Sequence, residues 1–274
     1  MMRYDRCGTI IAMNARTFRK RIVIANWKMN PATLAEAKAL FLDIKKEASR
    51  RSRVETAIAA PFVYLPELQK LIAGSRMRLA AQDVFWEKEG TYTGEVSVAQ
   101  LASVGVSHVI VGHSERRALG ESDEQVARKV VAVQKGGLAV VLCIGESERD
   151  TTGRYLNVIE TQLRSALANV PKTALENLRI AYEPVWAISH GDGKGHTATA
   201  GDVHEMTIFI RKVLTSLYTR PSAERVRILY GGSVNEGNAS VLIEEGNVDG
   251  FLVGGVSLKP RAFAAILTAA NESA

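Results

Sequence analysis

The sequence has few cysteines and no long apolar run, and both absences exclude classes of protein. Cys7 and Cys143 are the two cysteines among 274 residues, too few and too far apart for a disulfide framework. No apolar run approaches the roughly 20 residues that span a bilayer, and no short apolar stretch precedes a small-residue cleavage site like that of a secretory signal. We therefore expect a cytoplasmic protein without a membrane partner.

The positive charge is concentrated at the N-terminus. The net charge is +6, but residues 1–21 contain six basic residues and one acid, which leaves about +1 for the other 253 residues. A basic face for nucleic acid therefore has little support, and we expect no nucleic-acid partner. Residues 1–20 are expected to form a disordered basic extension, and residues 21–274 a single folded domain.

No linker or low-complexity segment divides the chain after residue 21. Short β-branched runs alternate instead with longer amphipathic stretches, which indicates parallel strands joined by right-handed crossovers. The expected strands are Ile22–Ala25, Thr56–Ala60, Arg78–Gln82, Ser107–Val111, Ala139–Cys143, Arg179–Tyr182, Arg227–Tyr230 and Asp249–Val253. The expected helices include Leu34–Ser49, Asp123–Gln134, Tyr155–Ala168 and Val203–Leu217.

Two architectures fit this alternation, a closed barrel and an open doubly wound sheet. The Gly-x-Gly-x-x-Gly motif of a dinucleotide-binding sheet is missing after the first strand, where Asn-Trp-Lys-Met-Asn stands at 26–30. The sequence therefore favours the α/β class and a single-domain (β/α)8 barrel with eight parallel strands. Active sites of such barrels are built from the loops that follow the strands, so the residues there are the candidates for chemistry.

Two strand ends carry residues suited to acid–base chemistry. Glu183 precedes Pro184, and because proline disfavours the helical conformation in the residue before it, Glu183 is expected to stand extended at its strand tip as a general base. His113 precedes the helix-initiating residues Ser114 and Glu115. The positive helix end disfavours an imidazolium, so a neutral His113 would donate to a substrate carbonyl. Each residue alone also fits a purely structural role.

Other strand ends indicate a site for an anion. Asn26 and Lys28 follow the first strand, where an ammonium can attract a phosphate and stabilise an enediolate. Glycine pairs at 231–232 and 254–255 follow the seventh and eighth strands, and glycines let main-chain N–H groups approach an anion. Barrels commonly bind phosphate with these two loops, so we expect a phosphorylated substrate.

The loop after Glu183 is rich in glycine. A mobile loop there would exclude water from a reactive intermediate. His190, Asp192 and His196 in this loop could be imagined as metal ligands, but glycine-rich flexibility supports a metal site poorly. We expect no metal and no cofactor.

Several long motifs stand in a fixed order along the chain, at 25–30, 93–95, 111–117, 120–122, 181–188, 230–234 and 253–255. In these motifs the chain resembles the triosephosphate isomerase family, over nearly its whole length from Arg21 to Ala269. The resemblance implies an aldose–ketose isomerase of glycolysis and gluconeogenesis. It would interconvert D-glyceraldehyde 3-phosphate and dihydroxyacetone phosphate through a cis-enediolate.

The resemblance also implies catalytic roles. Glu183 resembles the base that shuttles a proton between neighbouring carbons, and His113 resembles the electrophile. Lys28 and Asn26 match residues near the phosphate and the developing oxyanion. Glu115 matches an acid that orients the site through the side chain of Lys28.

The same resemblance implies a phosphate grip and a subunit contact. Main-chain N–H groups around Ser233, Gly254 and Gly255 would bind the phosphate. Family members are homodimers in which the loop after the third strand, here about Phe85–Thr93, inserts beside the partner's site. Thr93 would be the residue that reaches across.

The chain departs from the family pattern at three places. Eight residues separate Ile188 from Thr197, so the phosphate-binding glycine of that loop matches Ser189 by count and Gly191 by residue type. Asp83 stands where the family usually has asparagine, at the start of the dimer loop. Val256 stands where it usually has alanine. None of these changes removes a catalytic group.

Two alternatives remain open at this stage. The unusual loop would suit isomerisation of a related phosphosugar such as a tetrulose phosphate. A barrel that binds phosphate without catalysis is the other, although such a protein is expected to have lost at least one of Lys28, His113 and Glu183.

Overall fold

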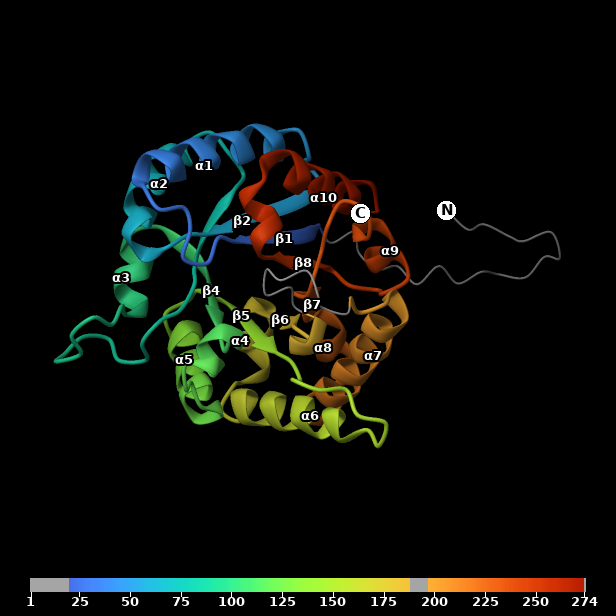
Figure 1. The fold of residues 1–274 in the computed structure, drawn as a ribbon. Helices are drawn as coiled ribbons and strands as arrows, with labels where there is room; N and C mark the ends of the chain where they lie inside the picture. Colours follow the sequence, from blue (N-terminus) through green and yellow to red (C-terminus); the bar gives the residue numbers. More distant parts are fainter. Residues whose placement is uncertain (1–19, 188–196, 274) are drawn as a thin grey trace.

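The structure is a computed structural model that describes residues 20–187 and 197–273. Its eight strands close into one barrel in chain order, each paired in parallel with its neighbours. Figure 1 shows the helices arranged around these strands. The expectation of a (β/α)8 barrel is confirmed and the open sheet is excluded.

The strands lie within a residue or two of their expected bounds. They are β1 (Arg21–Asn26), β2 (Val54–Ala59), β3 (Arg78–Ala81), β4 (Val106–Val111), β5 (Ala139–Ile144), β6 (Leu178–Tyr182), β7 (Arg227–Tyr230) and β8 (Gly250–Val253).

The helices of the described residues follow the strands. The α-helices are α1 (Leu34–Ser49), α2 (Leu65–Leu71), α3 (Val98–Ser103), α4 (Ser114–Ala118), α5 (Asp123–Lys135), α6 (Arg154–Leu167), α7 (Ala200–Leu217), α8 (Arg220–Arg225), α9 (Ala239–Glu244) and α10 (Pro260–Glu272). The 3-10 turns are η1 (Phe62–Tyr64), η2 (Lys172–Asn177), η3 (Val185–Ala187) and η4 (Gly255–Leu258). None of the helices in this part of the chain is long and apolar enough to cross a membrane.

Capping side chains fix where several helices begin. Thr33, Ser97, Ser122 and Thr199 each accept the main-chain N–H three residues ahead, and the side chain of that residue returns the contact. Such a reciprocal pair satisfies two N–H groups that the helix cannot. At α7 the pair formed with Asp202 starts the helix at Ala200, earlier than the expected Val203.

The barrel closes where β8 meets β1. Gly250 has φ +149°, and a Cβ at this position would lie 1.8 Å from the carbonyl oxygen of Ile22. Only glycine allows so close an approach of the two backbones. Asp249 completes the junction, because its N–H donates to Ile228 and its carbonyl accepts from Ile22.

Two apolar layers hold the fold together. The larger lies between the strands and the helices, and the smaller fills the barrel interior. The interior layer consists of Ile22, Ile24, Ala57, Ala59, Ala80, Ile110, Val141, Cys143, Ala181, Leu229 and Leu252. This packed interior separates polar groups at the two ends of the barrel, so each end can carry different chemistry.

Candidate active site

The proposed catalytic residues come together at the carboxyl ends of the strands. Asn26 ends β1, His113 follows β4 and Glu183 follows β6. An unbroken row of contacts joins four side chains: Lys28 Nζ lies 2.5 Å from Glu115 Oε1, Glu115 Oε2 lies 3.8 Å from His113 Nδ1, and His113 Nε2 lies 3.4 Å from Glu183 Oε1. Parallel strands share one rim, and this is why residues so far apart in sequence meet here.

Glu183 is buried, with only 2% of its surface exposed. Its main-chain N–H donates to Ile144 at 2.8 Å, and its Oε2 accepts from the main-chain N–H of Ser114 at 3.3 Å. A Cβ on Gly231 would lie 2.7 Å from Cγ of Glu183. Gly231, which the sequence assigned to phosphate binding as one of a pair, therefore provides the space that the carboxylate occupies.

His113 is oriented by its own helix. It is the N-cap of α4, and its Nδ1 accepts the main-chain N–H of Glu115 at 3.2 Å. Because Nδ1 is the acceptor, the proton of a neutral ring is on Nε2, the nitrogen that faces Glu183. The neutral, donating role expected for His113 requires this tautomer and stays a prediction.

Lys28 occupies a left-handed backbone conformation with φ +54°. Such a conformation costs a non-glycine residue about 1 kcal/mol or more and persists only where neighbours enforce it. Asn26 is one such neighbour, since its Oδ1 accepts the N–H of Lys28 at 3.0 Å. Gln82 is another, since its amide donates to the carbonyls of Lys28 and Ala59, both at 2.8 Å. Sequence reasoning did not identify the role of Gln82.

The expected phosphate-binding residues lie on the same rim, after β7 and β8. A Cβ on Gly254 would lie 3.3 Å from Cε of Lys28, which puts this backbone beside the ammonium stem. Gly255 begins η4 and is exposed, and Val256 packs in the same turn against the apolar core. Ser233 Oγ donates to the carbonyl of Ala187 at 2.9 Å.

Two sequence expectations cannot be compared with this site. Ser189 and Gly191, the two matches for the remaining phosphate contact, lie outside the described residues. The imagined metal ligands at 190, 192 and 196 lie there too. Among residues 20–187 and 197–273, no group of three His, Cys, Asp or Glu side chains could bind a metal ion.

Thr93 is exposed in the loop between β3 and α3, and Figure 1 shows that loop extending away from the barrel. Exposed apolar side chains occur on this loop and near the site, namely Tyr92 at 44%, Met29 at 93% and Leu119 at 79%.

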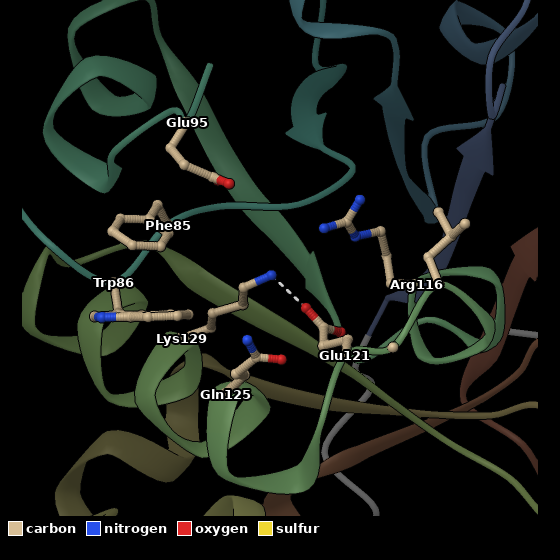
Figure 2. Close-up of a pocket in the computed structure, with 9 residues that line it drawn as sticks. Phe85, Trp86, Glu95, Arg116, Glu121, Gln125 and Lys129 are labelled. Carbon is tan, nitrogen blue, oxygen red and sulfur yellow. Dashed lines mark hydrogen bonds and ion pairs between the residues drawn. The ribbon is translucent and has the colours of Figure 1, made fainter. Parts of the chain in front are cut away.

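Asp83 belongs to a cluster of charged side chains in which Glu121 and Lys129 are also buried and Arg116 is partly exposed. Its Oδ1 lies 2.6 Å from Nζ of Lys129 and its Oδ2 lies 3.0 Å from Nε of Arg116. Lys129 also contacts Glu121, and Figure 2 shows this contact in a pocket between Arg116 and the rings of Phe85 and Trp86. The departure from asparagine thus gives two cations and two carboxylates that balance in charge.

Two further residues near Glu183 were not identified as functional from the sequence. Burial raises the pKa of the Cys143 thiol well above its usual value, and the charge and hydrogen bond of Glu183 raise it further. Glu146 is buried, and its Oε1 accepts from Tyr182 Oη and Trp186 Nε1, both at 2.8 Å. The alternation of β5 could have placed Cys143 inside the barrel, but no local pattern marks Glu146.

The arrangement defines a class of protein. A buried carboxylate facing an imidazole nitrogen, with an ammonium beside glycine backbone, is suited to moving a proton next to the carbonyl of an anionic substrate. The site is that of an acid–base enzyme built on a (β/α)8 barrel.

Comparison with known proteins gives the particular family. The sequence profile of triosephosphate isomerase matches residues 21–270. A triosephosphate isomerase of Citrifermentans bemidjiense is 44% identical over 251 residues, covering 91% of this chain and 98% of the relative. Those of Thermoanaerobacter sp. (strain X514) and Lactiplantibacillus plantarum are 43% and 39% identical, covering 91% and 93% of this chain and 99% and 100% of the relatives. The chain belongs to the triosephosphate isomerase family.

Proposed function

We propose that this chain interconverts D-glyceraldehyde 3-phosphate and dihydroxyacetone phosphate. The observation that carries the proposal is the unbroken row from Lys28 through Glu115 and His113 to Glu183. A base, a carbonyl-polarising donor and a cation for the phosphate are the three groups that this isomerisation requires. The family relationship supports the same reaction.

In the proposed mechanism Glu183 removes a proton from the carbon next to the substrate carbonyl. The electron pair of that C–H bond forms the carbon–carbon double bond of an enediolate, and the carbonyl electrons move to oxygen. His113 donates from Nε2 to this oxygen and transfers a proton between the two oxygens. Glu183 then returns its proton to the neighbouring carbon, so no external acid, oxidant or cofactor is consumed.

Lys28 and the glycine loops would fix the phosphate. The Lys28 ammonium offers a positive charge beside Gly254, and η4 begins with N–H groups that its own turn cannot satisfy. Glu115 would orient the ammonium, and Asn26 would maintain the strained backbone that presents it. Ser233 and Gly255 complete the proposed grip, with Ser189 as the proposed contact from the following loop.

A coupled assay with the purified protein tests the function. We expect turnover in both directions and tight calorimetric binding of a phosphoglycolate-like enediolate mimic. Comparison of kcat/KM for three- and four-carbon phosphosugars is expected to favour the triose. Tight binding of the mimic without turnover would instead indicate a binding protein, and preference for the longer sugar would indicate a different isomerase.

We also propose that the chain acts as a homodimer in the cytoplasm. The extended loop and the exposed side chains of Tyr92, Met29 and Leu119 support a subunit contact near the site, with Thr93 reaching the partner. Sedimentation at micromolar concentration is expected to give twice the chain mass of 29.8 kDa, and a monomer with full activity would contradict the proposal. Imaging of the tagged chain tests the location.

A further inference from the structure

Arg149 lies at the centre of a cluster that the proposed mechanism does not use. It belongs to the loop between β5 and α6, and its side chain is only 17% exposed. Its NH1 lies 3.1 Å from Asp202 Oδ1, and its NH2 pairs with Glu205. Its guanidinium carbon lies 4.9 Å from the ring centroid of Tyr155 and 5.9 Å from that of Trp186.

Trp186 connects this cluster to the base. Tyr182 and Trp186 stand on either side of Glu183 in sequence, and both donate to the same oxygen of Glu146. The turn that carries Glu183 is therefore fixed from its two ends by one buried carboxylate. Arg149 adds a contact to the face of the Trp186 ring, so its loss would leave that ring held by its indole N–H and by its packing against the apolar core.

Arg149 also joins two elements that follow β6. Trp186 lies in η3, whereas Asp202 and Glu205 lie in the first turns of α7. One planar guanidinium contacts both, and Tyr155 Oη donates to Glu205 at 2.9 Å to brace the same carboxylate. Arg149 therefore links the orientation of the Trp186 ring to α7, a long helix of the barrel.

We propose that Arg149 is a positioning residue for the general base. It holds the Trp186 ring, and through that ring the turn that carries Glu183, in a fixed position relative to α7. The inference rests on the proposed isomerase function. It assigns no direct contact with substrate to Arg149, so its removal is expected to act on the rate of proton transfer and not on binding of the phosphate.

The chemistry of the side chain gives the proposal a graded test. Arg149→Met keeps the apolar stem but removes the charge and the planar group. Arg149→Lys keeps the charge for Asp202 and Glu205, but an ammonium cannot cover the Trp186 ring as a guanidinium does. Arg220→Met is the matched control, because Arg220 forms an exposed pair with Glu224 on α8.

Each variant is assayed for kcat and KM, with competent sites counted by calorimetric titration with phosphoglycolate. A small misplacement of a reacting group can reduce the rate about 100-fold, and for this indirect effect we expect about a 10-fold loss of kcat in Arg149→Met. KM is expected to stay within about twofold, with Arg149→Lys intermediate and Arg220→Met unchanged. Because proton abstraction becomes slower, the deuterium isotope effect on kcat is expected to rise in Arg149→Met.

Other results would contradict the proposed role of Arg149. If kcat per competent site in Arg149→Met equals that of Arg220→Met, or if only the number of competent sites falls, Arg149 has a merely structural role and the inference is wrong. A rise in KM alone would also overturn it. An inactive wild-type protein would refute the proposed function itself, which separates the two failures.

Discussion

Each end of the barrel contains a histidine–glutamate pair, and in both pairs the histidine comes from β4 or directly follows it. At the carboxyl end, His113 Nε2 lies 3.4 Å from Glu183 Oε1, and at the amino end His108 Nε2 lies 3.5 Å from Glu55 Oε1. The residue types and the distances are nearly the same. What surrounds each pair is different, and that difference decides which pair can act on a substrate.

The pair at the amino end is enclosed by its own counter-charges. Arg227 lies 3.0 Å from Glu55 Oε2, and Arg179 is buried nearby. Burial works to raise the pKa of Glu55, but the charges of Arg227 and His108 and the hydrogen bond of Arg227 lower it overall. Burial is also the main cause that lowers the pKa of His108 to about 4. This end is a set of opposite charges packed against one another, in which His108 Nε2 and Arg179 Nε make no hydrogen bond within the described residues.

The pair at the carboxyl end is held by main-chain groups instead. Ser114 N–H donates to Glu183 and Glu115 N–H donates to His113, while the nearest cation in the row, Lys28, is bound to Glu115. Uncharged donors orient a carboxylate and an imidazole without neutralising them. We infer that the proposed catalytic pair differs from the structural pair because its neighbours leave its proton transfer available to a ligand.

The largest expected effect follows from replacing the two carboxylates in turn. Glu183→Gln removes the proposed base, and because general-base catalysis is worth about 100- to 10,000-fold, we expect kcat to fall about 1,000-fold. Glu55→Gln is expected to keep kcat within about threefold. The coupled assay measures both, and undiminished turnover in Glu183→Gln would refute the assignment of the base.

The histidines give a similar but smaller contrast. His113→Gln retains a hydrogen-bond donor but cannot exchange a proton, so we expect about a 100-fold loss of kcat. His108→Gln changes a residue within β4 at the amino end of the barrel, five positions before His113, and is expected to leave kcat nearly unchanged. Equal losses in the two variants would mean that the ends of the barrel are not chemically distinct.

The sequence predicted the architecture, and it singled out the proposed catalytic side chains more readily than the residues that support them. Regular alternation predicts strands, and the motifs around His113 and Glu183 are local, so both could be read from the chain. Glu146, Gly231 and Gln82 act through contacts between loops of different strands. Such contacts exist only after the barrel closes, and no spacing in the sequence marks them.

Asp83 and the amino-end cluster illustrate the same limit. The departure at Asp83 was visible in the sequence, but its pairing with Lys129 and Arg116 required the fold. Nothing in the sequence marks Arg179 and His108 as buried, because polar and charged side chains of a strand normally face solvent. Their burial inside the barrel follows from the closure of eight strands, which turns alternate side chains inward.

Removing the carboxylate of Glu55 tests the structural role of the charged groups at the amino end of the barrel. Glu55→Gln leaves Arg227 without its carboxylate and removes the nearest negative charge from Arg179 and His108. Breaking a largely buried pair costs about 3 kcal/mol, so we expect the free energy of unfolding in urea to fall by about this amount. Glu224→Gln, at an exposed pair, is the control and is expected to change it by less than about 0.5 kcal/mol.

The smallest expected effect is a pH dependence of stability that originates at the amino end of the barrel, at His108. The pKa of His108 is lowered from 6.5 to about 4 on folding, so the unfolded chain binds the proton more readily and stability is lost as pH falls from about 6.5 towards 4. At pH 5 linkage gives a loss of about 2 kcal/mol relative to pH 7. Urea unfolding at pH 7 and at pH 5 is expected to show that the free energy of unfolding falls by about 2 kcal/mol less in His108→Gln than in the wild type. Carboxylates remote from His108 titrate alike in both proteins and cancel in the comparison. Parallel pH profiles would therefore show that folding leaves the pKa of His108 unchanged, and the two ends would then differ less than their surroundings imply.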